Sequence, residues 1–316
     1  MTKLDESQII AKFQKIFGNQ DFVTEDAELF KIGKQNVVAK VDTLVQSTDI
    51  PSKMSLKEAA RKSIVACVSD FAAKGARPQF AMISVNLPAG ISEQLVSQIA
   101  QGFKSASREF GVKILGGDTN QGKEVVFNVC MFGVGEKIVR RKGARDGDLI
   151  FVSGPFGITG VGLQILLKNI KTKEVFAKNA AKSVLRPIPR LEFGLKARQY
   201  FSSSMDSSDG LSTTLNEMSR QSKCKFIINN IPTKNEVYKF AKTHKSNFES
   251  LVFHTGEEYE IVFTAPKKYK TRIIKIAQTT KTPIIEIGSV LKGDGVYIQK
   301  DQKLKKLQDL GYHHFS

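Results

Sequence analysis

The spacing of apolar residues changes several times along the chain, and each change marks an expected helix or strand. Apolar residues recur every three or four positions over residues 6–17, which predicts an amphipathic helix. Residues 36–43 (NVVAKVDT) alternate instead, which predicts a strand with Lys40 and Asp42 on one face. A helix is expected over residues 56–76, whose penultimate residue is a glycine suited to a helix C-cap.

Strand and helix patterns continue to alternate after this segment. In order, we expect strands at 80–88, 112–117 and 124–135 with a helix at 91–111 among them, then a strand at 148–154, a helix after Gly160, a strand at 258–265, a helix at 267–278 and a strand at 283–290. This order is typical of an α/β or α+β protein. The charged, turn-rich stretch 137–148 separates the two halves, so we expect domains at 1–136 and 137–316.

Composition agrees with a folded two-domain protein. A chain of 316 residues with 41% hydrophobic content is long enough for two cores. No apolar run approaches the roughly 18 residues that span a bilayer, and the N-terminus lacks the features of a signal peptide. The three cysteines are far apart and suit neither a disulfide framework nor a metal knuckle. We therefore expect a cytoplasmic protein without a membrane segment.

The formal net charge of +17 has two interpretations. A nucleic-acid-binding protein is one, because lysines bind phosphates by releasing counterions. The lysines are nevertheless spread along the whole chain, without a basic block interleaved with aromatic residues. The distribution favours a basic surface that attracts ATP and other anions, and no specific nucleic-acid partner is expected.

Several aspartates stand where a purely structural role is hard to supply. Asp42 and Asp118 lie at expected strand ends, where ligands of open α/β sheets gather. Asp70 shares a helix face with small residues, so its carboxylate is either a buried ion with a partner or a ligand. Asp206 and Asp209 are three residues apart, and on a turn or first helical turn both face one point.

Convergence of these carboxylates would require a cation, because crowded carboxylates raise one another's pKa. Mg²⁺ prefers carboxylate oxygens and bridges to substrate phosphates, so a metal with a bound nucleotide is the joint interpretation. The glycine-rich stretch 153–164 lies between a strand and a helix but lacks the GK[ST] ending of a Walker loop. Tight turning and close helix packing are the favoured interpretation of its glycines.

Eight blocks in the same order resemble the thiamine-monophosphate kinase family, of the aminoimidazole ribonucleotide synthetase-like superfamily. They are TEDAELF (24–30), VDTLVQSTD (41–49), SDFAAKGARP (69–78), GGDT (116–119), RKGARDGD (141–148), DSSDGL (206–211), TGEEYEIVF (255–263) and GYHHF (311–315). The resemblance implies an N-terminal sheet domain that dimerises and a C-terminal α/β domain, with ATP between them. It also implies ATP- and Mg²⁺-dependent phosphorylation of thiamine monophosphate to thiamine diphosphate in a homodimer.

The resemblance assigns roles to individual residues. Its metal positions fall on Asp26, Asp42, Asp70, Asp118, Asp206 and Asp209, among which Asp42, Asp70, Asp118 and Asp209 are also the implied catalytic residues. Implied nucleotide contacts fall on Gly117, Asp118, Arg141 and Ser208, and implied substrate contacts on Asp49, Glu257 and Tyr312. Several Mg²⁺ ions are implied, with ATP as the co-substrate.

Two other functions stay open at this level. One is a different ATP-dependent synthetase of the same superfamily, such as an aminoimidazole ribonucleotide synthetase, although the GYHHF ending favours the thiamine branch. The other is a basic, non-catalytic nucleic-acid-binding protein, which explains the charge but gives the aspartate blocks no role.

Two positions depart from the family's pattern. Lys40 stands where a small hydroxyl residue is common, and Asp49 stands where histidine is common. Because Lys40 shares a strand face with Asp42, we hypothesise that its ammonium group supplies part of the charge of one magnesium ion.

Replacing Lys40 with serine should then raise the Mg²⁺ concentration that half-maximal turnover requires, because the lost positive charge must come from the metal. A magnesium titration of wild-type and Lys40→Ser activity measures this. An unchanged magnesium dependence would contradict the hypothesis.

Overall fold

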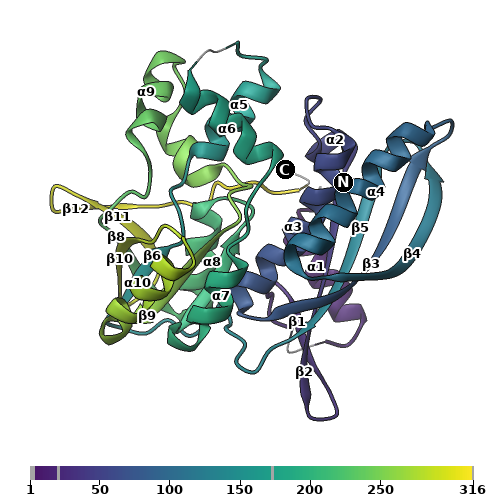
Figure 1. Cartoon of the computed structure of the whole chain (residues 1–316). Helices are drawn as coiled ribbons and strands as arrows, with labels where there is room; N and C mark the ends of the chain where they lie inside the picture. Colours follow the sequence, from purple (N-terminus) through teal and green to yellow (C-terminus); the bar gives the residue numbers. More distant parts are fainter. Residues whose placement is uncertain (1–3, 20–21, 172–173, 315–316) are drawn as a thin grey trace.

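Helix α3 (Leu56–Lys74) lies at the centre of the fold and packs against two β-sheets (Figure 1). The structure is a computed structural model, which describes residues 4–19, 22–171 and 174–314. Phe315, the last residue of the GYHHF block, lies outside the described residues. The mixed α/β architecture expected from the sequence is confirmed.

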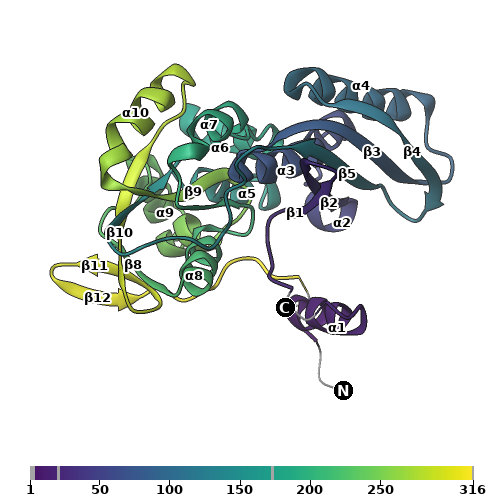
Figure 2. The ribbon, with the colours of Figure 1, turned by 90° about the horizontal axis from the view of Figure 1, so that it is seen from below.

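The first sheet has five strands in the order β1-β2-β5-β3-β4. Their bounds are β1 Glu28–Ile32, β2 Gln35–Val45, β3 Arg77–Pro88, β4 Lys113–Gly122 and β5 Val126–Val134. Strands β3 and β4 are parallel and are joined through helix α4 (Glu93–Phe110), whereas the other pairs are antiparallel. Burial alternates along β5, so one face of the sheet is covered by α3 and α4 (Figure 2).

The second sheet has seven strands in the order β12-β11-β8-β10-β6-β9-β7, and only β8 and β11 run parallel. Its strands are β6 Asp148–Val152, β7 Ser203–Ser207, β8 Cys224–Ile228, β9 Glu260–Pro266, β10 Ile285–Lys292, β11 Val296–Lys300 and β12 Lys303–Lys306. The accompanying helices are α5 Ile158–Leu167, α6 Val175–Leu185, α7 Leu191–Ala197, α8 Leu211–Ser222, α9 Asn235–Thr243 and α10 Lys270–Thr279. Four short helices lie between these elements: α2 Gln46–Asp49, η1 Arg198–Tyr200, η2 Ser250–His254 and η3 Lys267–Tyr269.

Alternating side chains of the second sheet contribute to two hydrophobic clusters. Phe151 and Phe263 belong to the cluster that includes α3, α7, α10 and the inner face of the first sheet. Ile150 and Val262, their neighbours in sequence, belong to the cluster beneath α5, α8 and α9. The first cluster therefore runs without interruption through both halves of the chain.

Local sequence explains where α3 begins and ends. Ser55 and Glu58 form a capping box at its N-terminus. Gly75 adopts the left-handed conformation at its C-terminus with φ of 65°, which confirms the expected C-cap. Small residues let both sheets approach the helix, and every residue from Ala59 to Lys74 except Ala66 is buried.

Most expected elements are present, with four corrections. Asp42 and Asp118 lie within strands and not at their ends, because β2 continues to Val45 and β4 to Gly122. The helix expected after Gly160 begins earlier, at Ile158, and contains Gly160 and Gly162 because α6 packs closely against it: a Cβ on Gly162 would lie 2.1 Å from the Ala180 carbonyl oxygen. Asp206 lies in strand β7 and not on a helical turn, and α8 begins only at Leu211. The sequence reading missed β1, β8 and the β11–β12 hairpin.

Helix α1 (Glu6–Ile16) occurs where expected but has no buried residue, and Figure 2 shows it beside the C-terminal segment, away from both sheets. Across the described ranges, no helix combines the length and apolarity needed to cross a membrane.

Candidate active site

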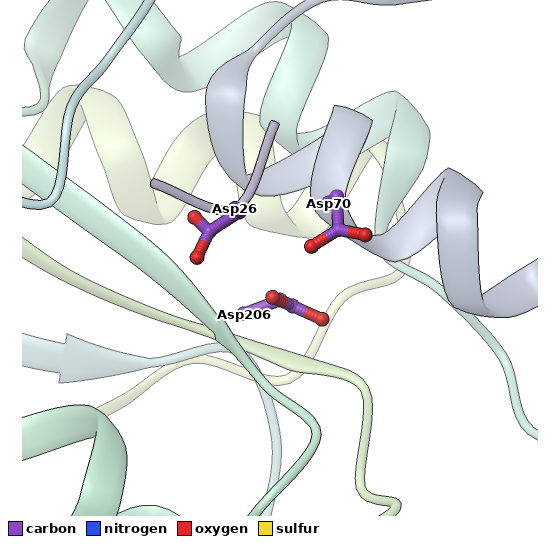
Figure 3. A group of neighbouring side chains, drawn as sticks. All are labelled: Asp26, Asp70 and Asp206. Carbon is purple, nitrogen blue, oxygen red and sulfur yellow. The ribbon is translucent and has the colours of Figure 1, made fainter. Parts of the chain in front are cut away.

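Three buried aspartates from distant parts of the sequence converge between the sheets. Asp26 precedes β1, Asp70 lies on α3 and Asp206 lies on β7, and one carboxylate oxygen of each lies within 4.8 Å of the others. Figure 3 shows the three side chains as close neighbours, with Asp26 and Asp70 above Asp206. The fold therefore brings together three of the residues singled out from the sequence.

The electrostatic environment divides this cluster into two parts. Burial and the nearby charge of Asp26 raise the pKa of Asp206 to about 6. Burial also raises the pKa of Asp70 well above its usual range, although Lys40 opposes the shift. Burial acts in the same direction on Asp26, but Arg141 and Lys74 outweigh it and lower the pKa of that carboxyl. Asp70 and Asp206 are thus the members that lack sufficient positive charge.

Lys40 forms an ion pair with Asp70, one member of this undercompensated pair. Its Nζ lies 3.0 Å from Asp70 Oδ2 and 3.9 Å from Asp42 Oδ2. Burial lowers the pKa of Lys40, but the two aspartates outweigh burial and raise it, so the side chain is protonated. This geometry supports the hypothesis that Lys40 supplies positive charge to the site. The expected effect of Lys40→Ser on magnesium dependence stays a prediction.

A pocket of about 620 Å³ opens beside the cluster. Most of the predicted site residues line it: Asp42, Asp49, Asp70, Asp206, Ser208, Asp209, Glu257 and Tyr312. Burial raises the pKa of Asp209 as well. Arg141 reaches the cluster from behind, with its Nε 2.6 Å from Asp26 Oδ1. One chain thus brings all but two of the predicted residues to the pocket or to the adjoining cluster.

Gly117 and Asp118 are the two residues that do not gather there. Both lie on β4, at the edge of the first sheet and three strands from Asp42 on β2. The row of paired residues through Asp118 contains Ser84, Asn128 and Thr43, whereas Asp42 belongs to the next row, whose side chains point to the opposite face. The exposed carboxylate of Asp118 therefore points away from the pocket of its own chain.

Comparison with known proteins identifies the family. Residues 24–135 match the family described as AIR synthase related protein, N-terminal domain. Over the full length of both chains, the sequence is 59% identical to the thiamine-monophosphate kinase of Nitrosopumilus maritimus. It belongs to the thiamine-monophosphate kinase family. A second member, from Pyrococcus horikoshii, is 34% identical over 99% of this chain and 97% of its own.

A solved member of the family has the same fold. AaThiL complexed with AMPPCP and TMP is 28% identical, with a TM-score of 0.88 over 99% of this chain and 98% of its own. Family membership confirms the resemblance drawn from the eight sequence blocks. It also decides against the two other functions that the sequence left open.

Lys62 also lines the pocket, and the sequence reading missed it. Its buried Nζ donates to the Asp49 carbonyl oxygen at 3.0 Å and to Glu257 Oε1. It thereby joins two predicted substrate residues from different halves of the chain. Glu257 Oε2 is buried and accepts no hydrogen bond within the described ranges. A charged lysine on the small-residue face of the helix was the available signal.

The glycine-rich stretch of this kinase is packed by protein groups. The N–H of Gly157, at the start of α5, donates to Glu258 Oε1 at 3.2 Å. Burial raises the pKa of Glu258 well above its usual range. A Cβ on Gly160 would lie 2.8 Å from the Leu251 carbonyl oxygen. These contacts support the interpretation of tight turning and close packing. The Gly157 N–H, which a bound phosphate would need as a donor, already donates to the Glu258 carboxyl group.

Asp206 makes the stability of the metal-free protein depend on pH. Its pKa rises from 3.8 when unfolded to about 6 when folded, so its ionisation costs stability as pH rises through this range. Replacing Asp206 with asparagine removes this cost. Relative to wild type, the variant should therefore gain up to about 3 kcal/mol between pH 4 and pH 7.

Urea unfolding with EDTA at a series of pH values measures the difference. Asp146→Asn, at an exposed aspartate, is the control and should show a flat difference. A pH-independent difference for Asp206→Asn would contradict the assigned environment.

Proposed function

We propose that this protein transfers the γ-phosphoryl group of ATP to thiamine monophosphate, giving thiamine diphosphate and ADP. An oxygen of the acceptor phosphate forms a bond to the γ-phosphorus as the bond from that phosphorus to the bridging oxygen of ADP breaks. The names of the relatives and the AaThiL complex with AMPPCP and TMP support this reaction. The carboxylate cluster beside a pocket is the observation in this chain that carries the proposal.

Magnesium is the second part of the proposal. Two of three converging carboxylates have raised pKa values, which fits a site that is stabilised by an added cation. Asp70 and Asp206 are placed to hold the metal, with Asp26 beside them and Asp42 and Asp209 at the pocket wall. Bound Mg²⁺ would neutralise the negative charge that two reacting phosphates bring together.

Residues around the metal position the two substrates in this proposal. Ser208 lines the pocket and Arg141 lies behind it, and we assign both to the nucleotide. Tyr312 presents a ring that is 49% exposed, which suits stacking on the flat cationic ring of thiamine. The unpartnered oxygen of Glu257 suits the positive charge of that ring, with Asp49 on the same wall.

A homodimer is proposed on the outer face of the first sheet. Val41, Phe80 and Met82 point from this face and are 63%, 41% and 48% exposed. An apolar sheet face of this kind is unusual on an isolated protein and suits burial against a second copy. Asp118 lies on the same outer face, so we propose that it completes the metal and nucleotide site of a second copy together with Gly117.

Two further assignments belong to the proposal. The division into domains 1–136 and 137–316 is supported by the two sheets, since β5 ends at Val134 and β6 begins at Asp148. A cytoplasmic location is supported by three free cysteines, which suit a reducing compartment.

Release of ADP in a coupled assay tests the reaction. With Mg²⁺ and ATP, thiamine monophosphate should support turnover, whereas free thiamine and the absence of acceptor should not. Asp70→Asn should lower kcat by about 10²-fold or more, because it removes charge that orients the metal and phosphates. Asp146→Asn serves as the matched aspartate control. Turnover with free thiamine but not with thiamine monophosphate would contradict the assigned acceptor.

Light scattering after gel filtration tests the dimer. Wild type should have twice the chain mass of 35.0 kDa, and Met82→Lys should have the mass of one chain, because a charge would be buried at the centre of the contact. Leu304→Lys, at an apolar residue of 51% exposure on β12, should leave the mass unchanged. A wild-type protein of 35.0 kDa would refute the dimer.

A further inference from the structure

Lys74, the last residue of α3, places a cation deep inside the carboxylate cluster. Its side chain is fully buried. Its Nζ lies 2.6 Å from Glu25 Oε2, 2.8 Å from Asp26 Oδ2 and 3.4 Å from the Ser204 carbonyl oxygen. An ammonium group with no path to solvent and three oxygen neighbours is fixed in place.

Arg141 occupies the other side of the same two carboxylates. Its Nε and Nη2 lie 2.6 Å and 2.5 Å from Asp26 Oδ1, and its backbone N–H donates to Glu25 Oε2 at 3.2 Å. Both oxygens of Asp26 therefore face protein cations. Two carboxylates meet two cations here, so this part of the cluster is already neutral.

The other part of the cluster is different. Asp206 accepts a hydrogen bond from the Ser69 hydroxyl at 2.8 Å, and no cation within the described ranges forms an ion pair with it. Asp70 pairs with Lys40, and both side chains line the pocket, so an added ion can reach Asp70 while Lys40 stays beside it. Room for an added cation is thus confined to Asp70 and Asp206.

We propose that Lys74 is a built-in cation that takes the place of one divalent ion at Glu25 and Asp26. This inference rests on the proposed function, in which the same cluster binds magnesium. Lys74 is a positioning residue: it holds Asp26 against the cluster and directs metal to Asp70 and Asp206. Removing its charge should convert Glu25 and Asp26 into an additional divalent site. The buried Glu25 Oε1, which has no hydrogen-bond partner among the residues that the structure describes, offers a further ligand atom.

Counting bound Mn²⁺ on the full-length chain tests the proposal. Electron paramagnetic resonance of free Mn²⁺ in a titration gives the number of ions bound per chain, without ATP or thiamine monophosphate. Lys74→Met should bind one more Mn²⁺ than wild type. Lys62→Met is the matched control, since Lys62 is an equally buried lysine of the same helix whose one carboxylate partner is Glu257; it should bind the wild-type number. Equal numbers for Lys74→Met and wild type would overturn the proposal.

Stability provides a second readout. In EDTA the melting temperature of Lys74→Met should fall below that of wild type, because Glu25 and Asp26 lose a partner, and Mn²⁺ should raise it by more than it raises wild type. If the variant does not fold in EDTA, Mn²⁺ should restore folding. Lys74→Gln, which keeps an N–H donor without the charge, is measured in parallel. The proposal is contradicted if Mn²⁺ neither stabilises nor refolds Lys74→Met and Lys74→Gln.

These results are separable from the phosphoryl-transfer assay. Ion number and melting temperature are measured without substrate, so they stand even if thiamine monophosphate proves not to be the acceptor. Conversely, unchanged ion number in an active enzyme would reject the role of Lys74 alone.

Discussion

Charge pairing along one buried helix is the constraint on which the fold and the site both depend. Helix α3 carries Arg61, Lys62, Asp70 and Lys74 into the space between the sheets, where an unpaired charge costs several kcal/mol. Each of the four finds its partner on a different element: Glu109 on α4, Glu257 before β9, Lys40 on β2, and Glu25 with Asp26 before β1. Pairing the buried charges of α3 therefore brings together elements that form the pocket.

Sequence reasoning succeeded where a local rule determined the outcome. Alternation placed Lys40 and Asp42 on one strand face, and a glycine after small residues marked the end of α3. The small-residue face around Asp70 indicated either a buried ion with a partner or a ligand, and the carboxylate is indeed buried, 3.0 Å from Lys40 Nζ. These features depend on residues that are near each other in the chain, so periodicity and capping chemistry suffice.

The remainder depended on contacts between distant segments. Nothing near Lys74 in the sequence indicates that Glu25 and Asp26 lie against it, and nothing near Lys62 indicates Glu257. The short strand β1 was missed because its residues are mostly exposed and do not alternate in polarity. Asp118 is a different case, because its row on the sheet is fixed by pairing that the sequence does not specify. The role proposed for it depends on the proposed second chain.

The continuous hydrophobic cluster bears on how the protein is held together. Side chains from α3, the first sheet, α7, α10 and one face of the second sheet share it, and Gly194 of α7 lies so close to α3 that a Cβ would come within 2.0 Å of the Ala72 carbonyl oxygen. The first half could not be excised with its core intact, whereas the second half also has a cluster of its own beneath α5, α8 and α9. The two sheets are thus separate in topology but share one cluster around α3, so a substitution that disturbs this junction alters the packing beneath the first sheet and beside the pocket together.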